Sequence, residues 1–269
     1  MPSGTDSRWR RRRSVGLLLV LIVLINLAVN PWLARYRSLI VMSGYDWWFE
    51  RKSLAHDAGV HVSMPLADGG LYPRLITYNS DAAMSGWLDA PVRFTVDFSF
   101  GDFAPWQGHS VIFDPADELY GSYVGAYYLQ GLAGPLTTRQ VELVAEFDQR
   151  VLALPALGLA AADAEFEVLA RSGGQSVAFA GRQWVSHEAR LRTNCPDHSP
   201  GGFSVTDLQF GRPPATAAHY PSCEMAARID VTYLPEPDLT IGLFIMAAST
   251  ETVDRLSDQV VRRAELVER

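Results

Sequence analysis

Basic residues are scarce in most of this chain, and lysine is almost absent. Of 269 residues, 23 are basic and 30 are acidic, and Lys52 is the single lysine. The first 42 residues hold seven arginines and one acidic residue. The remaining residues therefore include 16 of the 23 basic residues and 29 of the 30 acidic ones, which gives this part of the chain a formal charge of −13. Nucleic acids and anionic lipid surfaces attract clustered Lys and Arg. Nucleic-acid binding by the acidic remainder is therefore excluded.

Several short functional motifs are missing as well. The sequence has no Walker glycine loop, no Rossmann glycine pattern, no His-Glu-x-x-His and no Cys-x-x-Cys-His. Nucleotide-binding, zinc-protease and cytochrome functions thus have no support, and we expect no cofactor. No repeat or long Pro/Gly/Ser linker divides residues 43–269, which indicates one domain.

One long apolar run stands near the N-terminus. Val15 to Leu33 is an uncharged stretch of 19 residues, about 28 Å long as a helix and close to the roughly 30 Å of a bilayer core. Arg10 to Arg13 precede it, and Trp9 and Trp32 bracket it at interfacial positions. Because basic flanks stay in the cytoplasm, the run predicts a single-pass plasma-membrane anchor with an extracytoplasmic C-terminal domain.

A cleaved secretory signal peptide is the alternative for this run. Cleavage needs a small-x-small pattern after the apolar stretch, and Asn30-Pro31 fits that pattern poorly. Either interpretation exports the domain. The predicted organisation is a cytoplasmic basic tail at 1–14, an uncleaved anchor at 15–33, a juxtamembrane amphipathic segment at 34–52 and an extracytoplasmic, periplasmic-type domain at 53–269.

The periodicity of the exported part predicts a mixture of strands and helices. Three helices are expected, from Pro115 to about Gln130 with Asp114 as N-cap, from Thr137 or Thr138 to about Leu154, and from Thr250 to about Val267. Strands are expected at Arg93 to Phe100 (half-buried), Glu165 to Arg171, Ser176 to Ala180, Trp184 to Arg192, Phe203 to Phe210, Ala227 to Leu234 and Leu239 to Ala248. We further expect a hairpin turn at Gly173-Gly174. Because strands and helices are grouped, the fold class is α+β with a mainly antiparallel sheet.

Two cysteines, Cys195 and Cys223, suffice for one disulfide in an oxidising compartment. His198 and His219 offer an alternative, because Cys195, His198, His219 and Cys223 have a spacing that could supply four zinc ligands. Two free thiols are the remaining alternative. The disulfide is the prediction, and no metal is expected.

The densest group of reactive side chains lies between residues 108 and 118. His109, Asp114 and Asp117 could support acid-base chemistry, but Asp114 is also explained as a helix cap and Asp117 as a partner of the helix dipole. His56, Asp57 and His61 have a spacing that suits neither helix nor strand ligation, and we expect them to be solvated.

These observations predict a non-enzymatic envelope protein of binding or scaffolding type, with the lipid bilayer and an envelope or membrane protein as partners. An accessory subunit of a membrane complex would fit this description. The alternative is an anchored hydrolase of envelope glycan, lipid or peptide, centred on His109. Three tryptophans near expected loops could form a binding surface or a core: Trp87, Trp106 and Trp184.

Overall fold

The chain divides into two compact units, Met1–Ser43 and Gly44–Arg269. The computed structural model describes residues 16–26, 53–65, 76–99, 103–104, 109–110, 118–156, 159–195 and 220–268.

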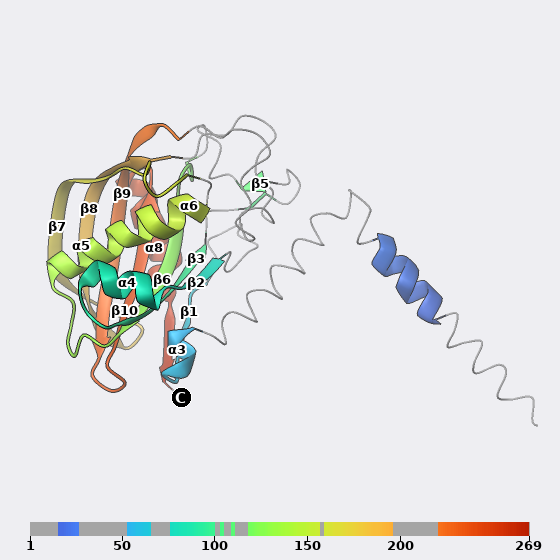
Figure 1. Ribbon diagram of the computed structural model, residues 1–269, viewed down its shortest axis with the longest axis horizontal. Helices are drawn as coiled ribbons and strands as arrows, with labels where there is room; N and C mark the ends of the chain where they lie inside the picture. The colour runs from blue at the N-terminus through green and yellow to red at the C-terminus, as the bar shows by residue number, and fades with distance from the viewer. Residues whose placement is uncertain are drawn as a thin grey trace, which may run out of the picture. The chain divides into compact units, whose positions relative to one another are not determined.

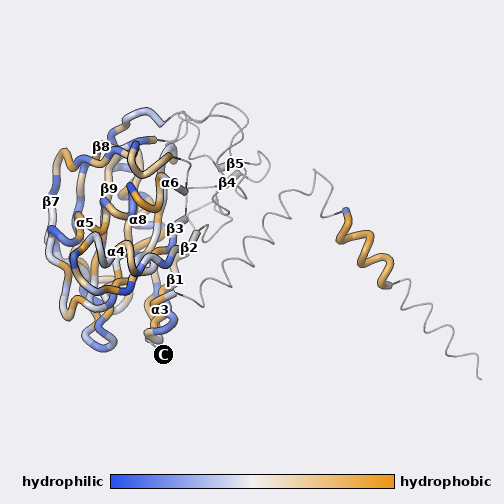
Figure 2. The backbone as a smooth tube through the Cα atoms, viewed as in Figure 1, coloured by the Kyte–Doolittle hydropathy of each residue, from blue (hydrophilic) through white to orange (hydrophobic). Residues whose placement is uncertain are grey.

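The described part of the first unit is a helix at 16–26, which is hydrophobic through most of its length (Figure 2). Its large apolar side chains are solvent-exposed, from 46% at Ile22 to 71% at Leu17. Among the described residues, no helix combines the length and the apolar character needed to cross a bilayer. The expected anchor at 15–33 extends past this helix, and the expected segment at 34–52 lies outside the described residues. Both therefore stay predictions.

The second unit is built on a seven-stranded antiparallel sheet (Figure 1). All its neighbouring strands pair antiparallel, which confirms the α+β class with an antiparallel sheet. In spatial order the strands are β2 (Ile76–Asn79), β3 (Arg93–Ser99), β6 (Tyr123–Gln130), β10 (Leu239–Ala247), β9 (Ser222–Leu234), β8 (Arg182–Asn194) and β7 (Phe166–Phe179).

Helices cover both faces of this sheet. One face carries α4 (Asp81–Leu88), α5 (Thr138–Phe147), a π-helix (Asp148–Ala153) and α6 (Leu154–Ala156) (Figure 1). The opposite face carries α3 (Leu54–Asp57), α8 (Thr250–Gln259), a 3₁₀ turn (Val261–Arg263) and the pair of β1 (Val60–Ser63) with β11 (Glu265–Glu268). A separate two-stranded pair joins β4 (Phe103–Ala104) to β5 (His109–Ser110).

Strand β10 divides the core into two apolar layers. All nine of its residues are buried, and side chains along a strand alternate between faces. Ile241 and Leu243 join the cluster under α8, whereas Phe244 packs against Tyr123 and Tyr127 on the α5 side. The prediction of a central strand covered on both faces is confirmed.

The segment predicted as a helix from Pro115 to Gln130 is instead strand β6 over Tyr123–Gln130, so that prediction is wrong there. Its aromatic residues recur every three or four positions, a spacing that also fits a helix. The decisive contact is at Gly125, where a Cβ would come 2.4 Å from the Asp97 carbonyl oxygen and 2.2 Å from the Phe244 ring. The glycine thus lets two neighbouring strands approach closely. Residues 115–117 and Asp114 lie outside the described residues.

The predicted hairpin at Gly173-Gly174 is also wrong. Strand β7 continues through both glycines, with irregular register at Val168/Ala170 and Gly173/Gln175. Gly174 has φ +79°, and the register shift at this point shows that the glycine forms a bulge. The turn follows at Ala180 and Gly181, which have φ of 50° and 70°, as a two-residue primed turn requires.

Two smaller expectations differ from the structure. The C-terminal helix ends at Gln259, well before Val267, because the chain turns to pair β11 with β1. Phe94 to Asp97 of strand β3 are buried on both faces instead of one, and Thr95 accepts a hydrogen bond from the Leu54 amide of α3. The strand at Phe203 to Phe210 lies outside the described residues.

Other local predictions are confirmed. The capping box holds the start of α5, where Thr137 accepts from the Gln140 amide and the Gln140 side chain accepts from the Thr137 amide. Cys195 and Cys223 form a disulfide with Cα atoms 5.8 Å apart. The bond ties the end of β8 to the start of β9.

Candidate functional site

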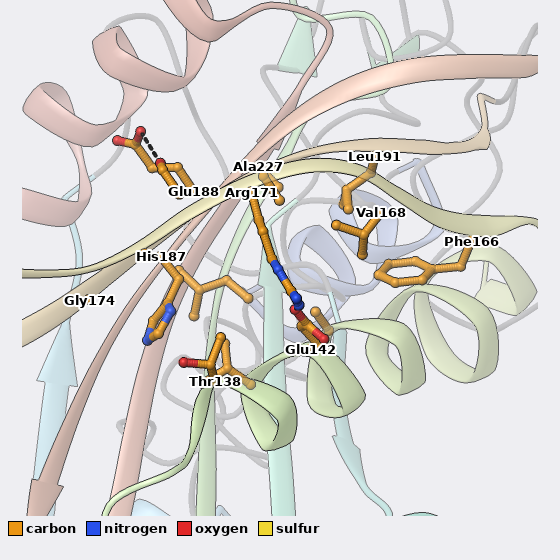
Figure 3. A pocket seen from close by; sticks show the side chains of 16 residues that line it. Thr138, Glu142, Phe166, Val168, Arg171, Gly174, His187, Glu188, Leu191 and Ala227 are labelled. Atoms are coloured by element: carbon orange, nitrogen blue, oxygen red, sulfur yellow. Dashed lines mark hydrogen bonds and ion pairs between the residues drawn. The ribbon is translucent and has the colours of Figure 1, made fainter.

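A cavity of about 240 Å³ lies between α5 and the strands β7, β8 and β9 (Figure 3). We call it the α5 cavity. It exists because small residues stand where larger ones would fill the space under the helix, namely Ala145, Gly173, Gly174, Ala189 and Ala227. Its apolar walls come from α5, β7, β8 and β9, with Val141, Phe166, Val168, Leu191 and Ile229 contributing.

An ion pair closes one side of this cavity. The Arg171 guanidinium of β7 extends toward Glu142 of α5 and donates to its carboxylate (Figure 3). Arg139 also lies 3.4 Å from the Glu142 carboxylate. The charge of Glu142 is therefore matched by two arginines, and the pairing joins edge strand β7 to the helix above it.

His187 of β8 contributes a titratable group to the wall. Burial lowers the pKa of its imidazole, an effect that the negative charges of Asp230 and Glu142 partly oppose. The ring is therefore mainly neutral at pH 7. An uncharged imidazole suits a cavity whose other walls are largely apolar.

A smaller hollow of about 30 Å³ adjoins the α5 cavity, and we call it the inner chamber. The two spaces share a wall made by Ala145, Phe166, Leu191, Ala227 and Ile229. The inner chamber is also lined by four polar residues of β6 and the π-helix, which are Tyr123, Tyr127, Asp148 and Gln149.

Asp148 is the most unusual residue of this chamber. Its side chain is 5% exposed, and its Oδ1 has no hydrogen-bond partner. Burial raises the pKa of this carboxyl well above its ordinary value, which favours its neutral, protonated form. Burial, and then the charge that Asp148 would carry, also raise the pKa of the Tyr123 and Tyr127 phenols. The three side chains therefore form one electrostatic group.

The π-helix begins where polar groups enter the chamber. Phe147 ends α5 and packs against Trp87 and Phe94. Asp148 and Gln149 are the first two residues of the π-helix, are 5% and 2% exposed, and both line the chamber. Such π turns are frequent at functional sites.

A hydrogen-bond chain orders the opposite side of the chamber. Tyr123 donates to Gln149 Oε1, and Gln149 Nε2 donates to Thr193 Oγ1 at 2.8 Å. The Tyr127 hydroxyl has no partner. Asp148 and Tyr127 thus each have a buried polar atom without a hydrogen-bond partner, whereas the neighbouring Tyr123 and Gln149 side chains are hydrogen-bonded.

The residues predicted from sequence as catalytic lie elsewhere. The backbone of His109 pairs with Ala104 between β4 and β5, and its side chain, together with Asp114 and Asp117, falls outside the described residues. The hydrolase hypothesis therefore remains a prediction.

The metal alternatives can be placed in part. Both cysteine sulfurs are engaged in the disulfide, and His198 and His219 lie outside the described residues. Among the described side chains, no three His, Cys, Asp or Glu residues gather as a ligand set. His56 is exposed, and Asp57 forms an ion pair with Arg93 at 2.6 Å.

The tryptophans that are described serve packing. Trp184 is 1% exposed and stacks on Phe179 with ring centroids 4.6 Å apart. Trp87 packs edge-on against Phe147 and donates to the Leu143 carbonyl. Trp106 lies outside the described residues.

Sequence reasoning missed Asp148 and His187. Asp148 carried a signal, because Val141, Val144, Asp148 and Leu152 follow helical spacing and put one carboxyl on an apolar stripe. His187 carried none, since it is an ordinary polar residue of an alternating strand.

Comparisons with known proteins add little. No protein-family model and no curated protein matches the chain. A solved structure, LpqN of Mycobacterium tuberculosis, described as involved in cell envelope biogenesis, aligns with 77% of this chain and 84% of its own, at 12% identity and a TM-score of 0.28. A similarity at that TM-score carries no argument about fold or function.

Proposed function

We propose that this chain is a membrane-tethered envelope protein whose extracytoplasmic domain binds a small, mainly apolar ligand in the α5 cavity. The observation that carries the proposal is the cavity itself, whose walls are largely apolar and include His187, a group of lowered pKa. Asp148, whose pKa is raised, lines the adjoining inner chamber. Concave sites of this composition are the usual binding sites for small molecules.

The polar groups around the α5 cavity favour binding over catalysis. Glu142 is held by Arg171 and Arg139, so its carboxylate serves an ion pair. The Nδ1 of His187 lies against Gly173 on the neighbouring strand, which fixes the ring in the wall. These contacts support a preformed cavity and a non-enzymatic role.

Export of the domain is supported by the disulfide, because such bonds persist in oxidising compartments. The apolar run at 15–33 would tether the domain to the plasma membrane, with Arg10 to Arg13 in the cytoplasm. Held there, the domain would exchange its ligand with the bilayer or with a membrane or envelope protein partner. A periplasm-dependent reporter enzyme fused after Arg269 should be active, and activity confined to a cytoplasm-dependent reporter would reject this topology.

Ligand binding is tested with a neutral probe and a cavity-filling variant. The full chain in lipid nanodiscs is titrated with 4-fluorotoluene and followed by ¹⁹F NMR, with empty nanodiscs as the blank. Ala145 faces both hollows, so Ala145→Met should raise the Kd at least ten-fold. Ala82→Met, on the exposed side of α4, is the matched control and should leave the Kd unchanged. Equal binding by both variants, or no saturable binding, would overturn the proposal.

A further inference from the structure

We infer that the inner chamber receives the hydroxyl group of the ligand, so that the ligand class is a neutral alcohol or phenol with an apolar body. The inference rests on the proposed function, because the body would occupy the α5 cavity. Beyond the proposed function, the inference identifies the chemical group that the protein recognises and the side chains that recognise it.

The size of the inner chamber limits the group that it can hold. About 30 Å³ accommodates a group the size of one water molecule and little more. A hydroxyl fits this space, whereas a phosphate or a sugar does not. Phe166, Leu191 and Ile229 line both hollows, so a molecule whose hydroxyl enters the inner chamber beside them would keep its apolar body in the α5 cavity.

The open hydrogen-bonding groups match a hydroxyl. Asp148 and Tyr127 each carry a buried oxygen without a partner, and buried polar atoms are otherwise almost always paired. In its protonated form, which burial favours, the Asp148 carboxyl can donate or accept, and so can the Tyr127 phenol. A ligand hydroxyl donates one hydrogen bond while it accepts another, and would therefore satisfy both oxygens at once.

The charge of the chamber excludes the obvious competitors. None of the residues described as lining it is Arg, Lys or His, so a carboxylate or phosphate would be buried beside Asp148 without a counter-ion. An ammonium group would have to be desolvated and would also require Asp148 to ionise, against the effect of its burial. A neutral group avoids both costs.

The experiment compares four probes with one body and different heads. The full chain in nanodiscs is titrated by ¹⁹F NMR with 4-fluorotoluene, 4-fluorobenzyl alcohol, 4-fluorobenzoate and 4-fluorobenzylamine. We expect the alcohol to bind about five-fold more tightly than 4-fluorotoluene and at least twenty-fold more tightly than the benzoate and the amine.

Variants assign the preference to the chamber. Tyr127→Phe should abolish the preference for the alcohol over 4-fluorotoluene and leave binding of 4-fluorotoluene intact. Asp148→Asn keeps a donor and an acceptor and should retain the preference, whereas Asp148→Leu should lose it. Tyr233→Phe is the matched control, because the Tyr233 hydroxyl donates to Asp238 away from the chamber.

The outcomes separate this inference from the proposed function. If 4-fluorotoluene binds but the alcohol gains nothing, or if Tyr127→Phe keeps the full preference, the hydroxyl inference is wrong and the cavity remains a binding site. If the amine binds best, with an affinity that rises with pH, the chamber recognises a cation and the inference is wrong. If no probe binds, the proposed function fails and the inference fails with it.

Discussion

Gly173 lies directly opposite His187 in the β7–β8 ladder, and a Cβ at position 173 would come within 2.8 Å of the imidazole Nδ1. The histidine ring therefore occupies the space that any other residue at 173 would need. This cross-strand pair sets the position of the ring in the wall of the α5 cavity.

Gly173→Ala should push the His187 ring out of this position. Because the obstructing atom belongs to a side chain that can rotate, we expect a loss of stability of no more than about 1 kcal/mol. Removing the ring from its partly buried site should move its pKa back up toward the ordinary value, since burial is what lowers it. An NMR titration of the His187 ring protons measures this shift.

Gly174→Ala is the control for this change. Nothing lies within 4 Å of its added Cβ, but φ is +79°, and a residue with a side chain there costs about 1 to 2 kcal/mol. Gly174→Ala should therefore lose more stability than Gly173→Ala, while the pKa of His187 stays lowered. The opposite ranking would contradict our account of the pair.

The fold was predictable where local chemistry and tertiary contacts agree. The buried run of β10, the capping box at Thr137 and the Cys195–Cys223 bond each have a local signature that the tertiary structure keeps. Strand β6 was not predictable, because its aromatic spacing suits a helix and the reason for a strand is the approach of Phe244 and Asp97 to Gly125. That contact joins residues distant in sequence.

The site was less predictable than the fold. Its walls come from α5, β7, β8 and β9. The cavity results from small residues such as Ala145 and Ala227, and the sequence around each of them contains no motif that indicates a binding site. The helical spacing of Asp148 from Val141 and Val144 indicates its inward position, whereas the π turn that begins at Asp148 has no sequence signature. Geometry among distant segments, rather than any motif, creates this site.

Asp148 should make stability depend on pH. Its folded pKa is raised by burial, so the stabilisation associated with the protonated carboxyl is full below the unfolded pKa of about 4 and is lost as pH rises through the folded value. In that window the native state holds one proton more than the unfolded state, and the free energy of unfolding falls by up to about 1.4 kcal/mol per pH unit.

Asp148→Asn removes this titration and keeps the shape. Urea unfolding of both proteins from pH 4.5 to pH 8 should show the variant gaining on the wild type as pH rises. Other buried carboxyls, such as that of Asp230, are present in both proteins and cancel in the difference. Parallel curves would mean that Asp148 is ionised or is not buried.

The disulfide should contribute substantially to stability. It joins cysteines 28 positions apart, and closing a loop of that length is worth about 3 to 4 kcal/mol in the chain-entropy model. Cys195→Ala with Cys223→Ala should lower the free energy of unfolding by about that amount. Dithiothreitol should destabilise the wild type similarly and leave the double variant unchanged, and an unaffected wild type would contradict a role for the bond.

Gly242 should tolerate no side chain while Tyr127 is present. A Cβ there would come 2.1 Å from Tyr127 Cζ, between two central strands, so Gly242→Ala should cost about 3 kcal/mol or prevent folding. Adding Tyr127→Leu should recover part of the loss, because the ring is what obstructs. Chemical denaturation of the single and double variants measures the coupling, and strictly additive losses would show that the two residues do not meet.

Tyr123 and Tyr127 allow one substitution to be tested in two hydrogen-bonding states on the same strand. Tyr123 donates to Gln149, whereas the Tyr127 hydroxyl is buried without a partner. Tyr123→Phe should therefore cost about 1 to 2 kcal/mol, since Gln149 loses its donor, while Tyr127→Phe should be neutral or stabilising, since an unsatisfied hydroxyl leaves the core. Urea unfolding without ligand ranks the stabilities of the two variants.

A Tyr127 hydroxyl that lowers the stability of the ligand-free protein would be expected if its role is to bind a ligand. A Tyr127→Phe protein less stable than the Tyr123→Phe protein would instead mean that the Tyr127 hydroxyl already has a structural partner.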